Sequence, residues 1–398
     1  MSSGRRFLAL CFVGALSAIL SACGNSGCGG ATFTTSGGGG GGSTTGNSSC
    51  SSGNSGNTGG NGTALDYIYS LDGYNIAGAY YTGSAVLAIA SFNAPALGSG
   101  SVADMAMVNG QFLYQPFVPT SGTSVLQGYS VSTSTGALSA IGGSPFATNS
   151  VADSIVADPK TRFLFAGESE KSTVDVFQIN ATTGALTLAP GSPYTLDFVP
   201  LSVAVDGTGT YLYVATDSGA GWTYGFAIDQ NTGALTALPG SPWPLSIVEI
   251  SGEPTGQFLI GRGTGTLQVF GIQTGTGTPL PLTTVNPAST ATNHMVVHPS
   301  GKFIYTFSQQ VSGGSNFPVE GFTLDPSSGS LTNMTGSPFT SLSSIYAGKI
   351  DPNGTALVGL TSSGQFQVYA VNATTGALTS NSQPYTGVAN VFFAVTNN

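Results

Sequence analysis

The chain has 398 residues, of which 40% are hydrophobic and only 6% are charged, and its formal net charge is −9 at pH 7. The hydrophobic fraction excludes a wholly disordered chain, and with eight basic residues no stripe remains that could hold nucleic acid phosphates. Ser, Thr, Asn and Gly must cover a surface that Glu and Lys usually cover on helices. The composition therefore favours β-strands and tight turns.

Residues 1–22 have the pattern of a signal peptide. Arg5 and Arg6 precede an apolar run, 7–20, that would reach about 21 Å as a helix, which is too short to span a bilayer. The run ends in Leu20-Ser21-Ala22-Cys23, which resembles a bacterial lipobox. The resemblance implies cleavage before Cys23, its acylation, and a lipid anchor in the bacterial cell envelope, on the periplasmic or surface side. The alternative is an ordinary signal peptide with a chance cysteine.

Residues 23–62 read as a flexible tether of Gly, Ser, Thr and Asn that begins at the acylated Cys23. Cys28 and Cys50 lie in this segment, and the sequence leaves open whether they form a disulfide. No cysteine follows Cys50, which excludes a thiol enzyme in the rest of the chain.

The octapeptide NATTGALT occurs at 180–187 and again at 372–379. It belongs to a family of segments that read approximately TGALT followed by GSPF, with glycines 48, 49, 96 and 47 residues apart. Those glycines are Gly136, Gly184, Gly233, Gly329 and Gly376. The gap of 96 contains a degenerate copy near Gly275 and Gly277. We predict that each copy is the tight turn between a third and an outer strand, with Leu186 and Leu378 buried between repeats.

A second signal has the same period, because short aromatic strands such as RFLFA and YLYVA recur after a turn about every 48 residues. A repeat of this length with several short strands is typical of a β-propeller blade. The span 63–398 therefore predicts an all-β, seven-bladed β-propeller of four-stranded antiparallel blades. The first repeat lacks its own inner strand, and the segment 390–398 is an inner strand without a successor. We expect the C-terminal strand to complete the first blade.

The turn and strand HPSGKFIY and the TGALT…GSPF hairpin resemble those of lactonase-like seven-bladed propellers, the group of 6-phosphogluconolactonase-type and YVTN-repeat proteins. The resemblance covers 63–398 and implies a site of His, Arg and Glu groups that face the axis. In the matching stretch His294 is kept, while Asn293 occupies the Arg position, Gln309 the Glu position, and Asp153 a position where the family tends to carry His. Gln cannot act as a general base and Asn cannot clamp an anion as Arg does.

Four residues form our candidate site. Glu168 is expected in an inter-strand loop with Glu170 and Lys171, and Arg262 in the equivalent loop two blades later. Because equivalent loops of a propeller open on one face, a shallow site of Asp153, Glu168, Arg262 and His294 is expected, with a solvated rim as the alternative. His298 fills a turn slot that other repeats fill with Asp or Glu. Its H-x₃-H spacing from His294 is too long on a strand for one metal ion. We expect no metal and no cofactor.

Three functions fit the sequence. The departures from the family pattern favour a lipid-tethered binding or interaction module with a degenerate active site, for an unknown small molecule or for an envelope protein or glycan. The second is a lactone hydrolase of the 6-phosphogluconolactonase-like family that acts on a lactone outside the cytoplasm. The third is a purely structural envelope protein. We expect a monomer that does not bind nucleic acid.

Overall fold

The computed structural model describes residues 66–72, 75–81, 86–88, 100–102, 104–120, 123–217, 221–288, 292–308, 319–341, 343–361, 365–380, 385–386 and 393–395. All of them lie in one compact unit, Gly60–Asn398. The predicted signal peptide, the tether and Cys23, Cys28 and Cys50 lie outside the described residues. In the described part of the chain, no helix is long and apolar enough to cross a membrane.

The described strands form seven antiparallel sheets, each with up to four main strands. The inner strands are β33 (Phe393–Val395), β4 (Gly100–Val102) with β5 (Ala106–Val108), β10 (Ala152–Ala157), β15 (Val199–Val205), β20 (Glu249–Gly252), β24 (Thr292–Val297) and β28 (Ile345–Ile350). The second strands are β1 (Asp66–Asp72), β6 (Phe112–Pro119), β11 (Phe163–Glu168), β16 (Tyr211–Asp217), β21 (Phe258–Gly263), β25 (Phe303–Ser308) and β29 (Ala356–Thr361).

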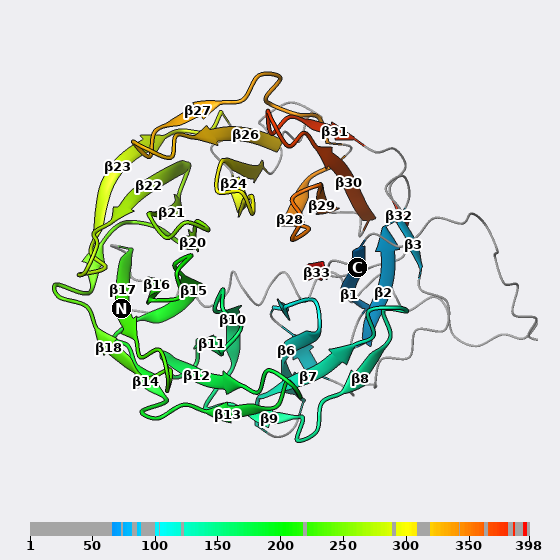
Figure 1. The fold of residues 1–398 in the computed structure, drawn as a ribbon, viewed down its shortest axis with the longest axis vertical. Coiled ribbons are helices and arrows are strands. Elements are labelled where there is room, and N and C mark those ends of the chain that lie inside the picture. Colours follow the sequence, from blue (N-terminus) through cyan, green and yellow to red (C-terminus); the bar gives the residue numbers. More distant parts are fainter. Residues whose placement is uncertain are drawn as a thin grey trace, which may run out of the picture. The chain divides into compact units, whose positions relative to one another are not determined.

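The outer half of each sheet follows the same order. The third strands are β2 (Asn75–Tyr81), β7 (Val125–Val131), β12 (Thr173–Ile179), β17 (Trp222–Ile228), β22 (Thr266–Ile272), β26 (Val319–Leu324) and β30 (Gln365–Val371). The fourth strands are β3 (Val86–Ala88), β8 (Leu138–Ala140), β13 (Leu186–Leu188), β18 (Leu235–Ala237), β23 (Pro279–Val285), β27 (Leu331–Asn333) and β31 (Leu378–Ser380). Within this unit the sheets follow one another around a central axis, and we number them as blades 1 to 7 (Figure 1).

The C-terminal strand closes the ring. Strand β33 pairs with β1 of the first blade, with Ile68 opposite Val395 and Ser70 opposite Phe393. Seven clusters of buried apolar side chains fill the joints between neighbouring blades, and one of them joins blade 7 to blade 1. The predicted all-β, seven-bladed architecture and the shared first blade are confirmed. Closure in this way removes the sheet edges that an open array of blades would expose.

Four blades carry a short additional strand that our sequence analysis missed. These strands are β9 (Phe146–Ala147), β14 (Tyr194–Thr195), β19 (Trp243–Pro244) and β32 (Tyr385–Thr386), and each pairs with the third strand of its blade. In blades 2, 3, 4 and 6, the serine hydroxyl of the GSP motif accepts a hydrogen bond from a backbone N–H of the third strand. In blade 3, Ser192 Oγ accepts a hydrogen bond of 2.9 Å from the backbone N–H of Val176 on β12. The repeated GSPF sequence thus folds the chain back along its own blade.

The TGALT turns join neighbouring blades. In blade 3 the Asn180 side chain accepts the backbone N–H groups of Thr182 and Thr183, each at 3.0 Å, and Gly184 has a φ of 72°. A Cβ on Gly184 would lie 2.5 Å from the ring of Phe112 on β6, so the turn lies directly against blade 2. The Tyr114 hydroxyl of blade 2 donates to the Gly184 carbonyl at 2.5 Å. Glycine is required here both by the left-handed backbone and by the close contact.

The same joint recurs around the ring. Tyrosine hydroxyls of the preceding blade donate to the turn carbonyls of Gly136, Gly277 and Gly376. The degenerate copy at Gly277 is therefore a working joint, and the predicted turn between the third and outer strands is confirmed. Leu186 is buried in the apolar cluster that joins blades 2 and 3, as expected, whereas Leu378 is only partly buried against the cluster that joins blades 6 and 7.

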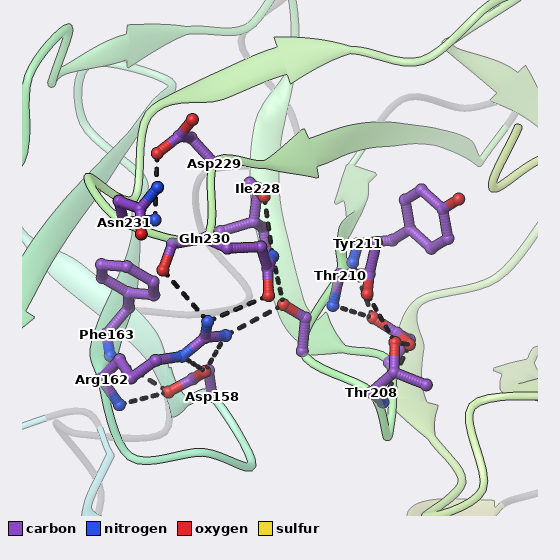
Figure 2. A network of polar contacts seen from close by, with 12 residues as sticks. Asp158, Arg162, Phe163, Thr208, Thr210, Tyr211, Ile228, Asp229, Gln230 and Asn231 are labelled. Carbon is purple, nitrogen blue, oxygen red and sulfur yellow. Dashed lines mark hydrogen bonds and ion pairs between the residues drawn. The ribbon is translucent and has the colours of Figure 1, made fainter. Parts of the chain in front are cut away.

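A second polar network ties blade 3 to blade 4 (Figure 2). Arg162 donates from Nη2 to Asp158 at 2.5 Å, from the same nitrogen to the Gly209 carbonyl at 3.1 Å, and from Nη1 to Gln230 Oε1 at 2.9 Å. Asp158 also accepts the backbone N–H of Phe163, so the carboxylate caps the turn that leads into β11. Charge-assisted bonds of this kind fix the geometry of the blade contact.

His298 occupies the slot of Asp158 in blade 6. Its Nδ1 lies 2.8 Å from Ser300 Oγ and its Nε2 lies 2.9 Å from the Gly354 carbonyl of blade 7. The predicted turn role of His298 is confirmed.

Candidate functional site

The inner strands of blades 3 to 7 line a cavity of about 610 Å³ on the axis of the propeller. Its wall is formed by β10, β15, β20, β24 and β28, together with Asp104 from blade 2. Most lining groups are apolar side chains and backbone. Six ionisable side chains interrupt this wall: Asp104, Asp153, Glu249, Arg262, His294 and Lys349. A volume of this size is typical of small-molecule sites.

Glu249, Arg262 and His294 form a compact cluster in this wall. Glu249 on β20 lies directly opposite Arg262 on β21 in the antiparallel register, and Arg262 Nε donates to Glu249 Oε2 at 2.6 Å. Glu249 Oε1 lies 2.5 Å from His294 Nδ1 on β24 of the next blade. Arg262 Nη1 also donates to the Thr292 carbonyl at 2.9 Å. The cluster therefore connects blades 5 and 6 at the axis.

Both ring nitrogens of His294 face hydrogen-bond acceptors. Nδ1 contacts the Glu249 carboxylate, and Nε2 lies 3.0 Å from the carbonyl of Gly348 on β28. The ring also stacks on Phe307, with centroids 6.0 Å apart and planes 16° apart. Neither a carboxylate nor a carbonyl can donate a proton, so both contacts are hydrogen bonds only in the imidazolium form. The His294 ring therefore bridges blades 5, 6 and 7.

The cluster controls the charge of Glu249. Burial alone would raise the pKa of Glu249, but the positive charges of His294 and Arg262 and their hydrogen bonds outweigh burial and lower the pKa to about 2. Glu249 is therefore an ionised carboxylate at neutral pH. Its two oxygens are occupied by the arginine and the histidine, so the carboxylate acts as an anchor for both cations.

The three remaining ionisable groups of the wall differ in how they are used. Asp104 accepts the backbone N–H groups of Met105 and Ile155, at 2.8 and 3.0 Å, and so holds blade 2 against blade 3. Asp153 on β10 is exposed to the cavity. Partial burial raises its pKa, hydrogen bonds with Ser169 oppose this shift, and the charge of Glu170 adds to it. Lys349 on β28 is half-buried in the wall.

Glu168 lies outside this cavity, contrary to the shallow site that we expected from the sequence. It ends strand β11 and is fully buried, where it accepts a hydrogen bond of 2.7 Å from Thr173 Oγ1. The backbone N–H of Asn149 lies within bonding distance of both Glu168 and Asp175. Burial raises the pKa of Glu168 to about 7, and the neighbouring Asp175 adds to this effect while Thr173 opposes it. This pair anchors the segment that leads into β10.

Arg262 is also misplaced in our sequence analysis, because it lies within strand β21 and not in a loop. The structure nevertheless brings Asp153, Arg262 and His294 into the wall of one cavity. Glu249, Lys349 and Asp104 also line this wall, and none of them was predicted from the sequence. A charged residue inside a strand repeat that is otherwise apolar is the signal that could have identified Glu249 and Lys349.

No group of three or more His, Cys, Asp or Glu side chains is placed to hold a metal ion within the described ranges. The backbone of Asn293 belongs to β24, and Gln309 lies outside the described residues.

Comparisons with known proteins agree with this architecture. Residues 124–244 match the family described as "Lactonase, 7-bladed beta-propeller". No curated protein sequence matches the chain. Among solved structures, a candidate 6-phosphogluconolactonase from Bacteroides uniformis superposes with a TM-score of 0.66 at 16% identity, covering 84% of this chain and 99% of that one.

Two further structures give similar values. A candidate 6-phosphogluconolactonase from Bacteroides fragilis has a TM-score of 0.63 at 16% identity, covering 84% of this chain and 98% of that one. The periplasmic gluconolactonase of Pseudomonas aeruginosa has a TM-score of 0.64 at 16% identity, covering 81% of this chain and 96% of that one. The resemblance to lactonase-like seven-bladed propellers is confirmed, and at these identities the structural likeness shows the fold alone.

Proposed function

We propose that this lactonase-like propeller binds a small polyhydroxy molecule in its axial cavity, either a sugar lactone or the hydroxy acid formed when the lactone ring opens. The observation that carries the proposal is the Glu249–Arg262–His294 cluster in the cavity wall. Fixed charges beside a cavity of about 610 Å³ offer a polar ligand both donors and acceptors. The lactonase match adds the chemical class of the ligand.

The arrangement of His294 favours binding over catalysis by this residue. A general base needs a free lone pair within reach of the proton it removes. Both nitrogens of His294 are directed at acceptors within the protein, at 2.5 and 3.0 Å. The two contacts leave neither nitrogen free to remove a proton, and they fix the position of the ring between two neighbouring blades.

A second candidate function, lactone hydrolysis, is favoured by Asp153. Its carboxylate is exposed in the same cavity, and the raised pKa makes it a better proton acceptor than an ordinary aspartate. In such a reaction Asp153 would remove a proton from water as the water attacks the lactone carbonyl. The cations of the wall would stabilise the oxyanion that develops. The ring C–O bond then breaks, and the leaving ring oxygen takes the proton held by Asp153 and becomes a hydroxyl group. The product is a hydroxy acid.

We also propose that the propeller acts outside the cytoplasm, held to the cell envelope by lipid on Cys23. The support is the lipobox-like Leu20-Ser21-Ala22-Cys23 after a short apolar run. Expression of the full chain in a bacterial host, with Cys23→Ser as the control, tests this proposal. The wild-type protein should sediment with membranes and carry acyl chains by mass spectrometry, while Cys23→Ser should carry none. An unacylated wild-type Cys23 would contradict the proposal.

Titration calorimetry and a lactone-opening assay together test the function. Glucono-1,5-lactone is followed in a pH-stat, because each ring opening releases one proton, and the uncatalysed rate is subtracted. Ligand binding without a rate above background supports a binding module. Turnover that disappears in Asp153→Asn, while a matched Asp197→Asn variant outside the cavity retains it, supports the hydrolase.

The double variant Asn293→Arg, Gln309→Glu tests whether the family pattern adds activity. Neither binding nor turnover with any lactone or hydroxy acid would contradict both functions.

A further inference from the structure

Six ionisable side chains line the axial cavity, and most of them are used by the protein itself. Asp104 accepts two backbone N–H groups. Glu249 is shared by Arg262 and His294, and His294 also reaches the Gly348 carbonyl. These four groups satisfy each other or the backbone. Of the remaining two, Asp153 is hydrogen-bonded to Ser169 but is still exposed to the cavity, and Lys349 is the cation that the wall offers to a ligand.

Lys349 is the cation of the wall that no described residue neutralises. Among the described residues, it makes no hydrogen bond and no ion pair. It follows Gly348, whose carbonyl lies 3.0 Å from His294 Nε2, so the Glu249–Arg262–His294 cluster contacts the same stretch of β28. A half-buried ammonium without a partner carries a desolvation cost that an incoming anion would offset. This end of the wall is therefore positive, and its lysine is available.

Asp153 and Lys349 place a negative and a positive group at different positions along the cavity wall. Asp153 lies on β10 in blade 3, whereas Lys349 lies on β28 in blade 7, with β15, β20 and β24 between them along the wall. An anionic group near Asp153 would be repelled, while hydroxyl groups there can donate to its carboxylate. A ligand with an acid at one end and hydroxyl groups along its length would match both ends of the wall.

We infer that Lys349 binds the carboxylate of the ligand, and that the preferred ligand is the open hydroxy acid instead of the neutral lactone. This inference rests on the proposed function, because it takes the polyhydroxy class of ligand from that proposal. It adds which chemical form is bound, which residue selects it, and how the ligand lies in the cavity. Lys349 then determines specificity in the binding module, and in a hydrolase it would bind the product.

Calorimetric titration of the full chain tests the inference with D-gluconate and sorbitol, a pair that differs in the carboxylate but shares the polyol. The variants are Lys349→Met and Lys349→Arg, with Lys160→Met, an exposed turn lysine, as the matched control. We expect Lys349→Met to raise the Kd for gluconate by about tenfold or more, the usual effect of losing a charge-assisted bond. The Kd for sorbitol should change less than about twofold. Lys349→Arg and Lys160→Met should bind gluconate nearly as the wild type does.

The possible outcomes are distinct. If gluconate and sorbitol bind equally well to the wild type and to Lys349→Met, the inference is overturned while the proposed binding function survives. If neither binds to the wild type, both are overturned. Glucose 6-phosphate, which has a phosphate and no carboxylate, supplies a third arm. Lys349-dependent binding of the phosphate alone would overturn the hydroxy-acid inference. The retained charge in Lys349→Arg and a thermal melt of each variant separate lost binding from lost folding.

Discussion

The joints between blades and the wall of the axial cavity use polar groups in opposite ways. At the joints the same contact recurs around the ring, with a tyrosine hydroxyl on a glycine carbonyl in four of them. In the cavity wall no contact is repeated, because Glu249, Arg262, His294 and Lys349 each occur in one blade only. Contacts that are repeated in several blades stabilise the fold. Charged residues that occur in one blade only are the ones that give the cavity its particular chemistry.

The two regions also differ in what remains unused. The joint groups are satisfied by backbone carbonyls and N–H groups, so they leave nothing for a ligand. In the cavity wall, Lys349 has no partner among the described residues, and Asp153 faces the cavity. We therefore expect substitutions at the joints to change stability and substitutions in the wall to change binding.

The largest expected effect concerns the glycine of a joint. Gly184→Ala places a methyl group 2.5 Å from the Phe112 ring at a φ of 72°, and should lower the free energy of unfolding by about 2–5 kcal/mol, from backbone strain and overpacking together. Gly275→Ala is the control, because Gly275 also has a positive φ but no atom within 4 Å. It should cost only about 1–2 kcal/mol, the backbone part. Equal losses in urea denaturation would refute the close contact.

The next effect separates the cluster from the joints by its pH dependence. The pKa of Glu249 falls from 4.5 to about 2 in the folded protein, so its charge stabilises the fold by about 3 kcal/mol above pH 4.5. A lowered pKa means that this contribution is lost as the pH falls from 4.5 through about 2. The stability gap between wild type and Glu249→Gln should therefore shrink as the pH falls from 4.5 toward 2. A gap that is independent of pH down to 2 would show that the charge is not responsible.

A smaller effect tests the hydroxyl of a joint. Tyr114→Phe removes the donor to the Gly184 carbonyl and should cost about 1 kcal/mol, or somewhat more because the acceptor is buried. Tyr129→Phe is the matched control, because the buried Tyr129 hydroxyl has no hydrogen-bond partner within the described part of the chain. It should be neutral or slightly stabilising. The two variants are compared by thermal unfolding. Equal losses of stability would show that the bond from Tyr114 to the Gly184 carbonyl does not stabilise the contact between the blades.

The sequence predicted the parts of the molecule that rest on local chemistry. Asn180 and Gly184 identify a tight turn by residue type alone, and the period of about 48 residues gives the number of blades. His298 could be placed because its slot is filled by Asp158 and Asp351 in other repeats, which cap the same turn. The pairing of β33 with β1 followed from the missing inner strand.

The site could be predicted only in part. Asp153 and His294 start inner strands, and this position alone places them near the axis. Glu168 is the last residue of a second strand, and its buried carboxylate lies beside Thr173 and Asp175. No local sequence pattern distinguishes this buried position from a position in a loop. Glu249 owes its role to Arg262 of its own blade and His294 of the next, a relation that depends on the packing of blades.

Two arginines allow the most direct test that the fold and the ligand are served by different regions. Arg162 binds Asp158 and Gln230 at a blade joint, and Arg262 binds Glu249 in the cavity wall. Each is replaced by Gln, and the Kd for D-gluconate is measured by calorimetry at a temperature where both variants are folded. Arg162→Gln should lower the melting temperature and leave the Kd within about twofold. Arg262→Gln should raise the Kd by about tenfold or more, because it leaves the negative charge of Glu249 in the cavity wall without its arginine partner, and that charge repels the anion. An unchanged Kd in Arg262→Gln, or an equal loss of binding in Arg162→Gln, would contradict the account.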